Sequence, residues 1–524
     1  MSYKVSLPQI GPYFCAISDT KYRFWCRAKG EGVGVIRYKQ SEHTRVHVHA
    51  FPLKRRFDNT GVVDLELEAN ETYIIQMGIV RNASIEQLSV PDLELKWPAD
   101  SEMYIKTFPK SGSTTEETAF LMGSSRHPGG WFSGNSDAAF ASMDAMMRAN
   151  SIKPGFILMT GGQVFADFKG NGPPSEIEAY FKKYRQAFSS PHFSRVLKKL
   201  PAYMIFNDHD IQRQWSIGKY ETAEKGFHMS LFSKAILAYQ SYQSNMSPVI
   251  KEDSSVADAP EIGLSIYGEK GYGEIPFWYE FNHGQCDFFV MDVRTERREP
   301  HCMISKQQLE CVQEFLLRDP GRKKFIVSSV PVFPDTRPPF GVPADKWTAF
   351  PNQRKQLLQF IEEKQKTGEV KDVIFLSGGV HCSFVAKAVF PKSQYSMYSV
   401  VSSSFNRLAK GLDNQDFLWE EVRGFPRNEL ALERKTYGGG MSKVQRESNF
   451  AYLSVVEDTL QIEFYSSDGV KLEDHVITLN TQPIQEPERY AVVGRLDSLN
   501  SESEVEEKKI LAFDKQGLGT RNYY

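Results

Sequence analysis

Two patterns of hydrophobic and polar positions divide the chain near residue 110. The first ~100 residues carry short apolar and aromatic runs separated by turn residues, which is typical of a small antiparallel β domain. The clearest strands are expected at residues 22–26, 34–38 and 73–77. We therefore predict an N-terminal β-sandwich domain over residues 1–105.

From about residue 115 apolar runs alternate with helical patterns. A helix with an apolar stripe is expected to begin at Ser175, where Glu178 completes a capping box, and another is expected over residues 353–366 before Gly368. Unbroken apolar runs of this length suit strands buried on both faces of a layered α/β fold. Those runs are residues 156–159, 203–206, 288–291, 325–327 and 373–376, with a further β-like stretch at 449–480. We predict a layered core domain, with β-sheets sandwiched between helices, over residues 115–480 and a charged C-terminal tail over residues 481–524.

Composition and charge mainly argue against certain classes of partner and site. The 524 residues are 41% hydrophobic, and 63 Lys+Arg against 65 Asp+Glu leave a formal charge of −2, so no global field indicates a nucleic-acid partner. No apolar run approaches the ~18 residues that a membrane span needs. The six cysteines lack the spacing of a disulfide framework or a zinc module. The N-terminus shows no secretory signal, so we expect a cytoplasmic protein.

One histidine pair stands out in the N-terminal region. His47 and His49 alternate with apolar residues, so both side chains are expected on the same face of a strand. Such a pair could belong to a metal site, but no third ligand is in view. The structural interpretation, a solvent-facing edge, is favoured.

Polar clusters follow the apolar strands of the larger region. Ligand sites of open α/β sheets gather just past the carboxyl ends of the strands, so these clusters are candidates for a shared site. Each has a structural explanation when taken alone, because Asp-His pairs cap helices and Asp-x-Arg sequences form ion pairs. The clusters are residues 123–130, 161–167, 207–215, 292–298 and 377–383.

Taken together and in order, these clusters resemble the motifs of the PhoD-like (alkaline phosphatase D) family. That family typically carries Gly-Ser-Cys-Arg-Tyr-Pro-Gly, Gly-Asp-Gln-Ile-Tyr-Ala-Asp, Asp-Asp-His-Asp/Glu, Leu-Asp-Thr-Arg-Thr and Ser-Gly-Asp-Val-His. The resemblance covers roughly residues 115–420, and the N-terminal segment, including Gly11-Pro12 and Trp25, resembles the family's leading sandwich domain. It implies a metallophosphatase-like α/β core, a bacterial source, and metal-assisted hydrolysis of phosphate mono- or diesters.

The resemblance also implies that the metal ligands have largely been replaced. Positions where the family has a cysteine, a bridging aspartate, a tyrosine and a second aspartate are occupied here by Ser125, Gly162, Phe165 and Gly379. An asparagine expected near Trp215 is absent as well. Glycine and phenylalanine offer no metal-binding side-chain atom, and a hydroxyl is a much poorer ligand than a thiolate. The residues left from the family's site are His381 and Asp208 as metal ligands and His209 as a catalytic residue, should the protein be active.

Residues that do not bind metal persist in the same motifs. We expect the ligand-binding residues of the site to be Arg126, Asp167, Asp210, Asp292 and Arg294. Two arginines of this set, together with Arg297, could hold an anion through bidentate hydrogen bonds. The pattern predicts a catalytically inactive pseudo-phosphatase without a cofactor, whose cleft binds an unknown protein partner or a phosphorylated small molecule.

Two alternatives remain open from the sequence. The first is an active phosphomonoesterase or phosphodiesterase with an altered site for a divalent metal (Ca, Fe, Mn or Zn), built on Asp208, His209, Asp210 and His381. The second is a structural or assembly protein that uses the N-terminal β domain and the charged tail.

Overall fold

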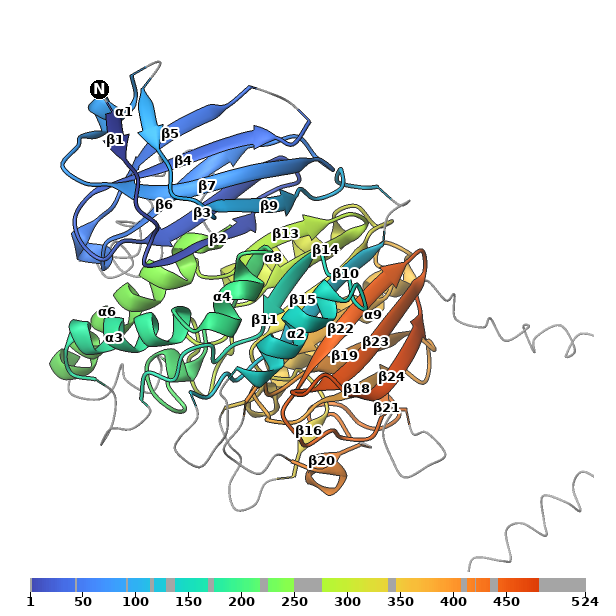
Figure 1. Ribbon diagram of the computed structural model, residues 1–524. Coiled ribbons are helices and arrows are strands. Elements are labelled where there is room, and N and C mark those ends of the chain that lie inside the picture. Colours follow the sequence, from blue (N-terminus) through green and yellow to red (C-terminus); the bar gives the residue numbers. More distant parts are fainter. Residues whose placement is uncertain are drawn as a thin grey trace, which may run out of the picture. The chain divides into compact units, whose positions relative to one another are not determined.

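The N-terminal strands form two antiparallel sheets that pack against each other in the computed structural model (Figure 1). The predicted β-sandwich and its strands at residues 22–26, 34–38 and 73–77 are confirmed. One sheet consists of β2 (Ile10–Ala16), β3 (Lys21–Arg27) and β6 (Thr60–Glu66), and the other of β5 (His47–Pro52), β4 (Val33–Gln40), β7 (Thr72–Val80) and β9 (Glu102–Lys106). A short parallel pair, β1 (Ser2–Lys4) and β8 (Glu94–Lys96), and two short helices, η1 (Arg55–Phe57) and α1 (Ile85–Leu88), complete this region.

The structure describes most of the chain up to residue 479. The described residues are 2–42, 45–90, 93–113, 117–128, 137–167, 174–216, 225–248, 276–337, 345–406, 412–419, 421–433 and 442–479. They belong to one compact unit, Met1–Asn480. The predicted charged tail at 481–524 lies outside the described residues.

Two larger sheets build the core. The first has the order β12-β11-β10-β22-β23-β24 and the second β13-β14-β15-β17-β19-β18-β21. The first sheet comprises β12 (Ala202–Met204), β11 (Phe156–Met159), β10 (Thr118–Gly123), β22 (Asn449–Val456), β23 (Thr459–Ser466) and β24 (Lys471–Thr478). The second comprises β13 (Tyr279–His283), β14 (Cys286–Val290), β15 (Lys323–Ser328), β17 (Val373–Ser377), β19 (Ser396–Val401), β18 (Phe384–Val389) and β21 (Ala431–Leu432).

Alternating side chains of the central strands belong to different hydrophobic cores. In β11, Phe156 and Leu158 lie in the core between the sheets, whereas Ile157 and Met159 lie in the core beneath the helices. In β17, Ile374 joins the core between the sheets and its neighbours join a third core. Successive strand residues point to opposite faces, so an unbroken apolar run places apolar side chains in both.

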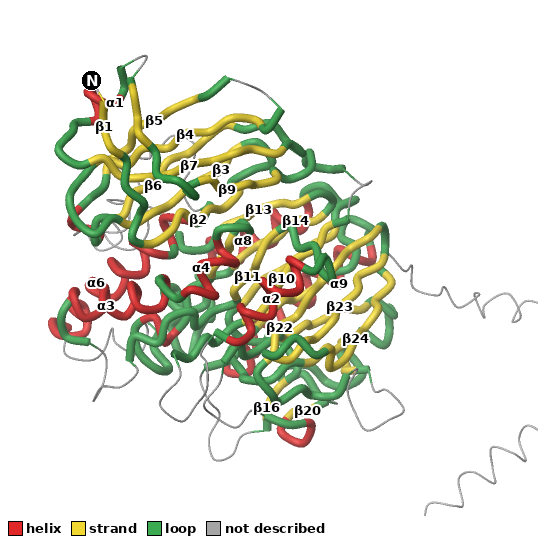
Figure 2. Tube along the Cα trace, viewed as in Figure 1, coloured by secondary structure: helices red, strands yellow, loops and turns green. Residues whose placement is uncertain are grey.

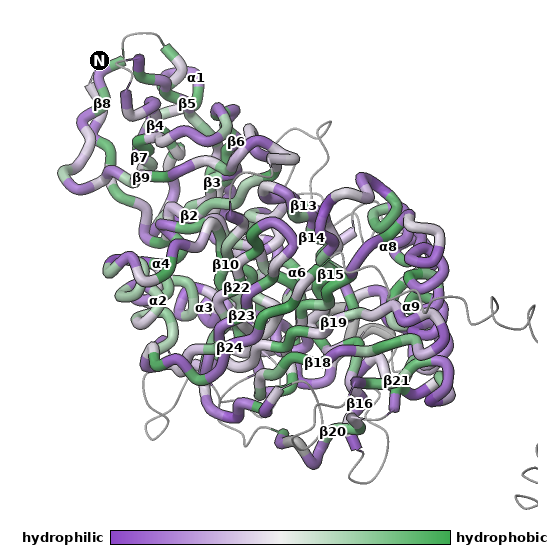
Figure 3. Tube along the Cα trace, turned by 90° about the vertical axis from the view of Figure 1, so that its right-hand side faces the viewer, coloured by the Kyte–Doolittle hydropathy of each residue, from purple (hydrophilic) through white to green (hydrophobic). Residues whose placement is uncertain are grey.

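Helices cover the outer faces of both sheets (Figure 2). Hydrophobic residues concentrate on central strands such as β15, whereas the outward side of α9 is hydrophilic (Figure 3). The first sheet is covered by α2 (Ala138–Arg148), α3 (Ile177–Phe188), α4 (Pro191–Leu197) and α6 (Lys225–Tyr242), and the second by α8 (Lys306–Leu317) and α9 (Pro351–Lys366). Smaller elements are η2 (Asp208–Asp210), η3 (Ser244–Met246), η4 (Trp347–Ala349), η5 (Asn414–Asp416) and the pair β16 (Asp335–Thr336) with β20 (Phe417–Leu418).

Two local predictions were wrong. The capping box at Ser175 does not form, because α3 begins at Ile177 behind an extended Glu176 that makes no side-chain cap bond. Glu178 pairs with Arg185 instead. The strand predicted over 203–206 ends at Met204, since its last apolar pair already leads into η2. By contrast, α9 ends as predicted before Gly368, whose φ of +75° is the left-handed conformation of a helix stop.

The N-terminal sheets are bound to the core by buried polar contacts. The Trp25 indole donates to the Ser241 carbonyl at 2.7 Å, and the Tyr13 hydroxyl donates to the Phe188 carbonyl at 2.5 Å. Asp58, in the turn between β5 and β6, accepts from Arg185 of α3 at 2.7 Å. Because these groups are buried and paired, separating the two regions would leave them unsatisfied.

No helix among the described residues is long and apolar enough to cross a lipid bilayer.

Candidate functional site

The predicted motifs meet at the ends of the central strands. Parallel pairing aligns the carboxyl ends of β10, β11 and β12 in one sheet and of β14, β15 and β17 in the other. Hydrogen bonds then join the motifs: Ser125 N donates to Gly161 O at 2.8 Å, and Gly379 N donates to the Ser124 hydroxyl at 3.3 Å. Arg294 Nε donates to Asn207 Oδ1 at 2.9 Å. We call the residues of these five motifs the strand-end site.

The loop after β11 would hold a Cβ at residue 162 in tight contact with its neighbours, without a severe overlap. Gly162 has a φ of +68°, and a Cβ added there would lie 3.3 Å from Ser125 Cα and 3.7 Å from the Phe165 ring. A Cβ at this position would therefore lie close to Ser125 and Phe165, two positions at which the sequence resemblance expects metal ligands. In this chain the position is a glycine, so it contributes no donor atom.

Aromatic packing occupies the next part of the loop. Phe165 is buried and stacks on His209 with ring centroids 4.2 Å apart, while His127 meets it edge-on at 5.0 Å. The apolar ring thus supports the imidazole.

His209 and Asp167 form a hydrogen-bonded pair. His209 Nδ1 lies 3.0 Å from Asp167 Oδ1, and the carboxylate also accepts from Arg213 N at 2.8 Å. Burial opposes the charge of both groups, but their hydrogen bond together with the nearby opposite charges outweighs burial, raising the pKa of His209 and lowering the pKa of Asp167. The imidazole is 20% exposed, so it can still meet a ligand.

Ser125 lies in a cluster of hydroxyl groups. It is buried with a φ of +55°, and its Oγ is 3.5 Å from the Oγ atoms of Ser124 and Ser403. Ser403 Oγ also accepts from His381 N at 3.1 Å. These neutral groups hold the loops together and supply no thiolate.

The loop after β17 leaves less room for a side chain at residue 379 than the loop after β11 leaves at residue 162. Gly379 has a φ of +75°, and a Cβ there would lie 2.6 Å from the Ser329 carbonyl oxygen. That distance is far inside van der Waals contact with a backbone atom, which cannot move like the end of a side chain. Any other residue here requires the chain near Ser329 to shift.

The first predicted anion-binding arginine is used internally. Arg126 makes a bidentate pair with Asp137, at 2.6 Å from Nε and 2.8 Å from Nη2, and both side chains are buried. Its guanidinium carbon also lies 4.0 Å from the centre of the Phe193 ring. An anion at Arg126 would have to displace Asp137, because the guanidinium fork that would hold it already holds a carboxylate.

The second predicted arginine is also enclosed by protein groups. Arg294 bonds Asn207 and pairs with both carboxylate oxygens of Asp345, and its Nη2 lies 3.6 Å from Asp208 Oδ1. Burial disfavours the guanidinium, but Asp345 and Asp208 outweigh it and raise the pKa of Arg294. Arg297, fully buried, lies 3.2 Å from the same Asp345. Arg294 thus stabilises a buried ion network and is not free to hold a ligand.

The remaining predicted aspartates bond to nearby groups. Asp292 accepts from the Arg294 and Thr295 amides at 2.9 Å each, and burial raises its pKa. Asp210 is fully buried and accepts from Tyr184 at 3.0 Å and Gln243 at 2.7 Å, and burial raises its pKa to about 7. Both act as anchors for the loops that carry them.

The residues present do not fit the family's metal centre. Asp208 accepts from Gln214 N at 2.6 Å and faces Arg294, so a cation already neutralises it. Ser125, Gly162 and Phe165 supply no anionic donor. Within the described ranges, no group of three or more His, Cys, Asp or Glu residues could hold a metal ion.

Some partners in the site were not identified from the sequence. Asp137, Asp345 and Ser403 pair with Arg126, Arg294 and Ser125, respectively, from distant loops. Single Asp and Ser residues in loops carry no periodic or spacing signal. Asn207 was part of a quoted motif, but its bond to Arg294 depends on two different sheets.

Comparisons with known proteins agree with this geometry. The family described as PhoD-like phosphatase matches residues 140–416. The solved structure titled "Structure of PhoD" has a TM-score of 0.64 at 15% identity, with 91% of each chain covered, which shows a shared fold. No curated protein matches the sequence.

Two further solved structures show weaker likeness. A conserved uncharacterised protein from Streptococcus pneumoniae TIGR4, a predicted phosphoesterase, gives a TM-score of 0.22 at 9% identity, covering 69% of this chain and 98% of its own. The NAD nucleotidase of Haemophilus influenzae gives 0.25 at 10% identity, covering 76% and 60%. At these TM-scores neither structure shows a fold shared with this chain.

Proposed function

The chain belongs to the PhoD-like phosphatase family, and from this premise we propose that it is a non-hydrolysing member that binds a phosphorylated ligand at the strand-end site. The observation that carries the proposal is the donor set around Asp208. Its carboxylate faces a buried guanidinium, and the neighbouring positions 125, 162 and 165 supply no anionic ligand. Metal-assisted phosphoryl chemistry needs anionic or imidazole ligands at fixed positions. This site lacks the anionic ligands that would hold the metal.

Ligand recognition would rely on the imidazole groups. With Arg126 and Arg294 paired internally, the groups suited to a phosphoryl oxygen are His209 and His381, which are both partly exposed. The raised pKa of His209 favours its cationic form, which attracts an anion. Asp167 holds Nδ1, so Nε2 is the atom that would contact the ligand.

The first test is metal analysis of the purified full-length chain after exposure to Ca, Fe, Mn and Zn. We expect well below one tightly held metal per chain and no turnover of p-nitrophenyl phosphate or its bis ester. The Ser125→Cys/Gly162→Asp/Phe165→Tyr variant restores three positions of the resemblance, and leaves Gly379 unchanged because a side chain there would require the chain near Ser329 to shift. Two tightly held metals in the wild type, or hydrolysis that a chelator abolishes, would contradict the proposal and support the metal-dependent alternative.

The second test is calorimetric titration with inorganic phosphate and p-nitrophenyl phosphate. We expect His209→Ala to weaken binding roughly tenfold, the size of one charge-assisted hydrogen bond. His301→Ala is the matched control, because that histidine is exposed and lies outside the five motifs. Equal phosphate affinity of His209→Ala, His381→Ala and the wild type would contradict ligand binding at the strand-end site. A protein partner, or a purely structural role, would then be favoured.

A further inference from the structure

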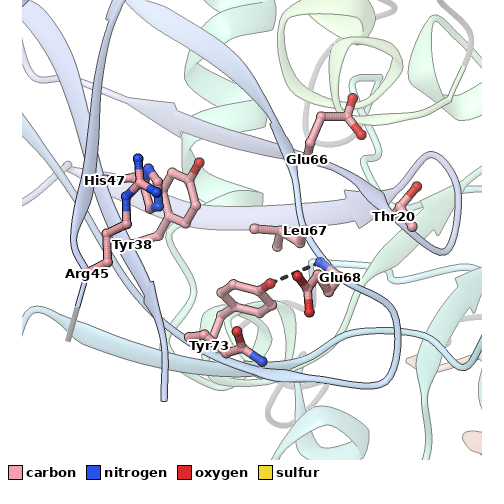
Figure 4. A pocket seen from close by; sticks show the side chains of 9 residues that line it. Thr20, Tyr38, Arg45, His47, Glu66, Leu67, Glu68 and Tyr73 are labelled. Atoms are coloured by element: carbon pink, nitrogen blue, oxygen red, sulfur yellow. Dashed lines mark hydrogen bonds between the residues drawn. The ribbon is translucent and has the colours of Figure 1, made fainter. Parts of the chain in front are cut away.

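A cavity lies in the N-terminal sheets, and the proposed function makes no use of it. It measures about 450 Å³, a size that suits a small-molecule ligand (Figure 4). Residues from both sheets and their loops form its walls. The lining residues are Thr20, Tyr38, Gln40, Arg45, His47, Glu66, Leu67, Glu68 and Tyr73.

The basic and the acidic side chains of this N-terminal pocket lie in two separate groups. Arg45 and His47 lie together on one side, whereas Glu66 and Glu68 lie across the pocket, beyond Leu67 (Figure 4). Within the part of the chain that the structure describes, the side chains of Arg45, Glu66 and Glu68 make no hydrogen bond or ion pair. Opposite charges that line one cavity without neutralising each other offer complementary ends to a ligand.

Aromatic rings and one hydrogen bond hold the walls in place. Tyr38 stacks on His47 with ring centroids 5.0 Å apart and on His49 at 5.7 Å. The buried Tyr73 hydroxyl accepts from Glu68 N at 2.9 Å, which anchors the acidic side. Rigid walls reduce the entropy lost when a ligand binds.

Both charge groups act on the same ring. Burial raises the pKa of the Tyr38 hydroxyl, Arg45 lowers it and Glu66 raises it further. Tyr38 therefore lies within the fields of both sides, and a ligand beside it would also meet both. Tyrosine faces add attraction for an ammonium group.

We propose that the N-terminal pocket binds a small zwitterion, a molecule with an anionic group at one end and an ammonium group at the other. The anion contacts Arg45 and His47. The ammonium contacts the Glu66 and Glu68 carboxylates beside the tyrosine rings. A simple anion would meet the two glutamates and a simple cation would meet the arginine, so neither matches the whole pocket. The histidine pair on β5 thus belongs to this pocket wall through His47.

The experiment is calorimetric titration of the full-length chain with paired probes. The zwitterions are O-phosphoethanolamine and phosphocholine, which carry phosphate, and β-alanine and glycine betaine, which carry carboxylate. The single-charge probes are inorganic phosphate, acetate, ethanolamine and choline. We expect at least one zwitterion to bind roughly tenfold or more tightly than either of the single-charge probes that match its two ends. Whether the phosphate or the carboxylate zwitterions bind more tightly identifies the anionic group.

Variants separate the two ends. Arg45→Gln should weaken zwitterion binding roughly tenfold, and Glu66→Gln should weaken it similarly without weakening inorganic phosphate. Arg55→Gln and Glu31→Gln are matched controls, because these exposed residues of the same region form an ion pair outside the pocket lining. Since all four side chains are exposed, the variants should fold normally.

Three results would overturn the inference. They are the absence of binding by every zwitterion, equal affinity for a zwitterion and one of its halves, and unchanged affinity in both Arg45→Gln and Glu66→Gln. His209→Ala, which tests the strand-end site, should leave the binding of β-alanine and glycine betaine unchanged, because these zwitterions carry no phosphate, so the two proposals can fail independently.

Discussion

The loops after β11 and β12 and the loops after β14 and β17 make up two halves of the strand-end site, and they differ in how closely protein atoms crowd the glycines at which the sequence resemblance expects metal ligands. In the first half a Cβ at Gly162 would lie 3.3 Å from Ser125 Cα, which is a tight contact. In the second half a Cβ at Gly379 would lie 2.6 Å from the Ser329 carbonyl oxygen, and the buried Arg294 is paired with Asp345. A new side chain therefore requires a small adjustment of neighbouring atoms in the first half and a shift of the backbone in the second.

This difference bears on function. A site with missing side chains could regain metal binding by a few substitutions, whereas a site filled by backbone and buried ion pairs could not. The second half thus weighs more heavily in favour of a non-hydrolysing protein.

The largest effect is expected from the ion network of the second half. Arg294→Ala leaves the buried Asp208 without a cation and leaves the partly buried Asp345 with Arg297 alone, so we expect the free energy of unfolding to fall by ~3–5 kcal/mol in urea denaturation. Arg55→Ala, a control whose side chain is 85% exposed, should change it by less than about 0.5 kcal/mol. A loss below about 1 kcal/mol for Arg294→Ala would show that the network does not stabilise this half.

The two glycines compare the halves directly. Gly379→Asp places a Cβ 2.6 Å from the Ser329 carbonyl in a left-handed backbone, so we expect a loss of ~3 kcal/mol or more. Gly162→Asp has the same left-handed strain but a milder backbone contact, 3.3 Å from Ser125 Cα, so ~1 kcal/mol is expected. Urea denaturation of both variants measures the two losses of unfolding free energy. Equal losses would contradict the expected difference in crowding between residues 162 and 379.

The pH dependence of the His209–Asp167 pair sharpens the description of the first half. The pair is fully charged between the ordinary pKa values of Asp, 3.8, and His, 6.5. Its stabilisation is lost as pH rises through the raised pKa of His209, and as pH falls through the lowered pKa of Asp167. We expect Asp167→Asn to cost on the order of 1 kcal/mol at pH 5.5 and less at pH 9, as measured by urea denaturation. A cost that does not change with pH would mean that His209 is neutral throughout.

The smallest effect is expected at Phe165. Phe165→Tyr keeps the ring that stacks on His209 and adds one hydroxyl on the half that has room, so the free energy of unfolding should change by less than about 1 kcal/mol. Thermal unfolding of the variant and the wild type measures it. A large loss would indicate that this half is closed as well.

Much of the fold could be predicted from local patterns. The strands at 156–159 and 373–376 were identified because alternate residues fill two cores, which demands continuous apolarity. The start of α3 was misplaced because a Ser-x-x-Glu spacing is a weak signal, and the extended Glu176 and the packing of α3 decide where the helix begins. Residue order also placed the five motifs at strand ends, where parallel pairing brings them together.

The roles of the arginines could not be predicted in the same way. Arg126 and Arg294 look like anion ligands in the sequence because their partners, Asp137 and Asp345, are single aspartates in other loops. A buried guanidinium must be paired, and only the folded chain shows which carboxylate pairs with it.

The sequence by itself determined the layered core, the family resemblance and the absence of donor atoms at positions 162, 165 and 379, because residue type and period are local properties. Only the tertiary structure decided which empty positions remain open, which arginines are occupied and which charges line the N-terminal pocket. Those properties depend on distances between groups far apart in the chain, and such distances are set by packing.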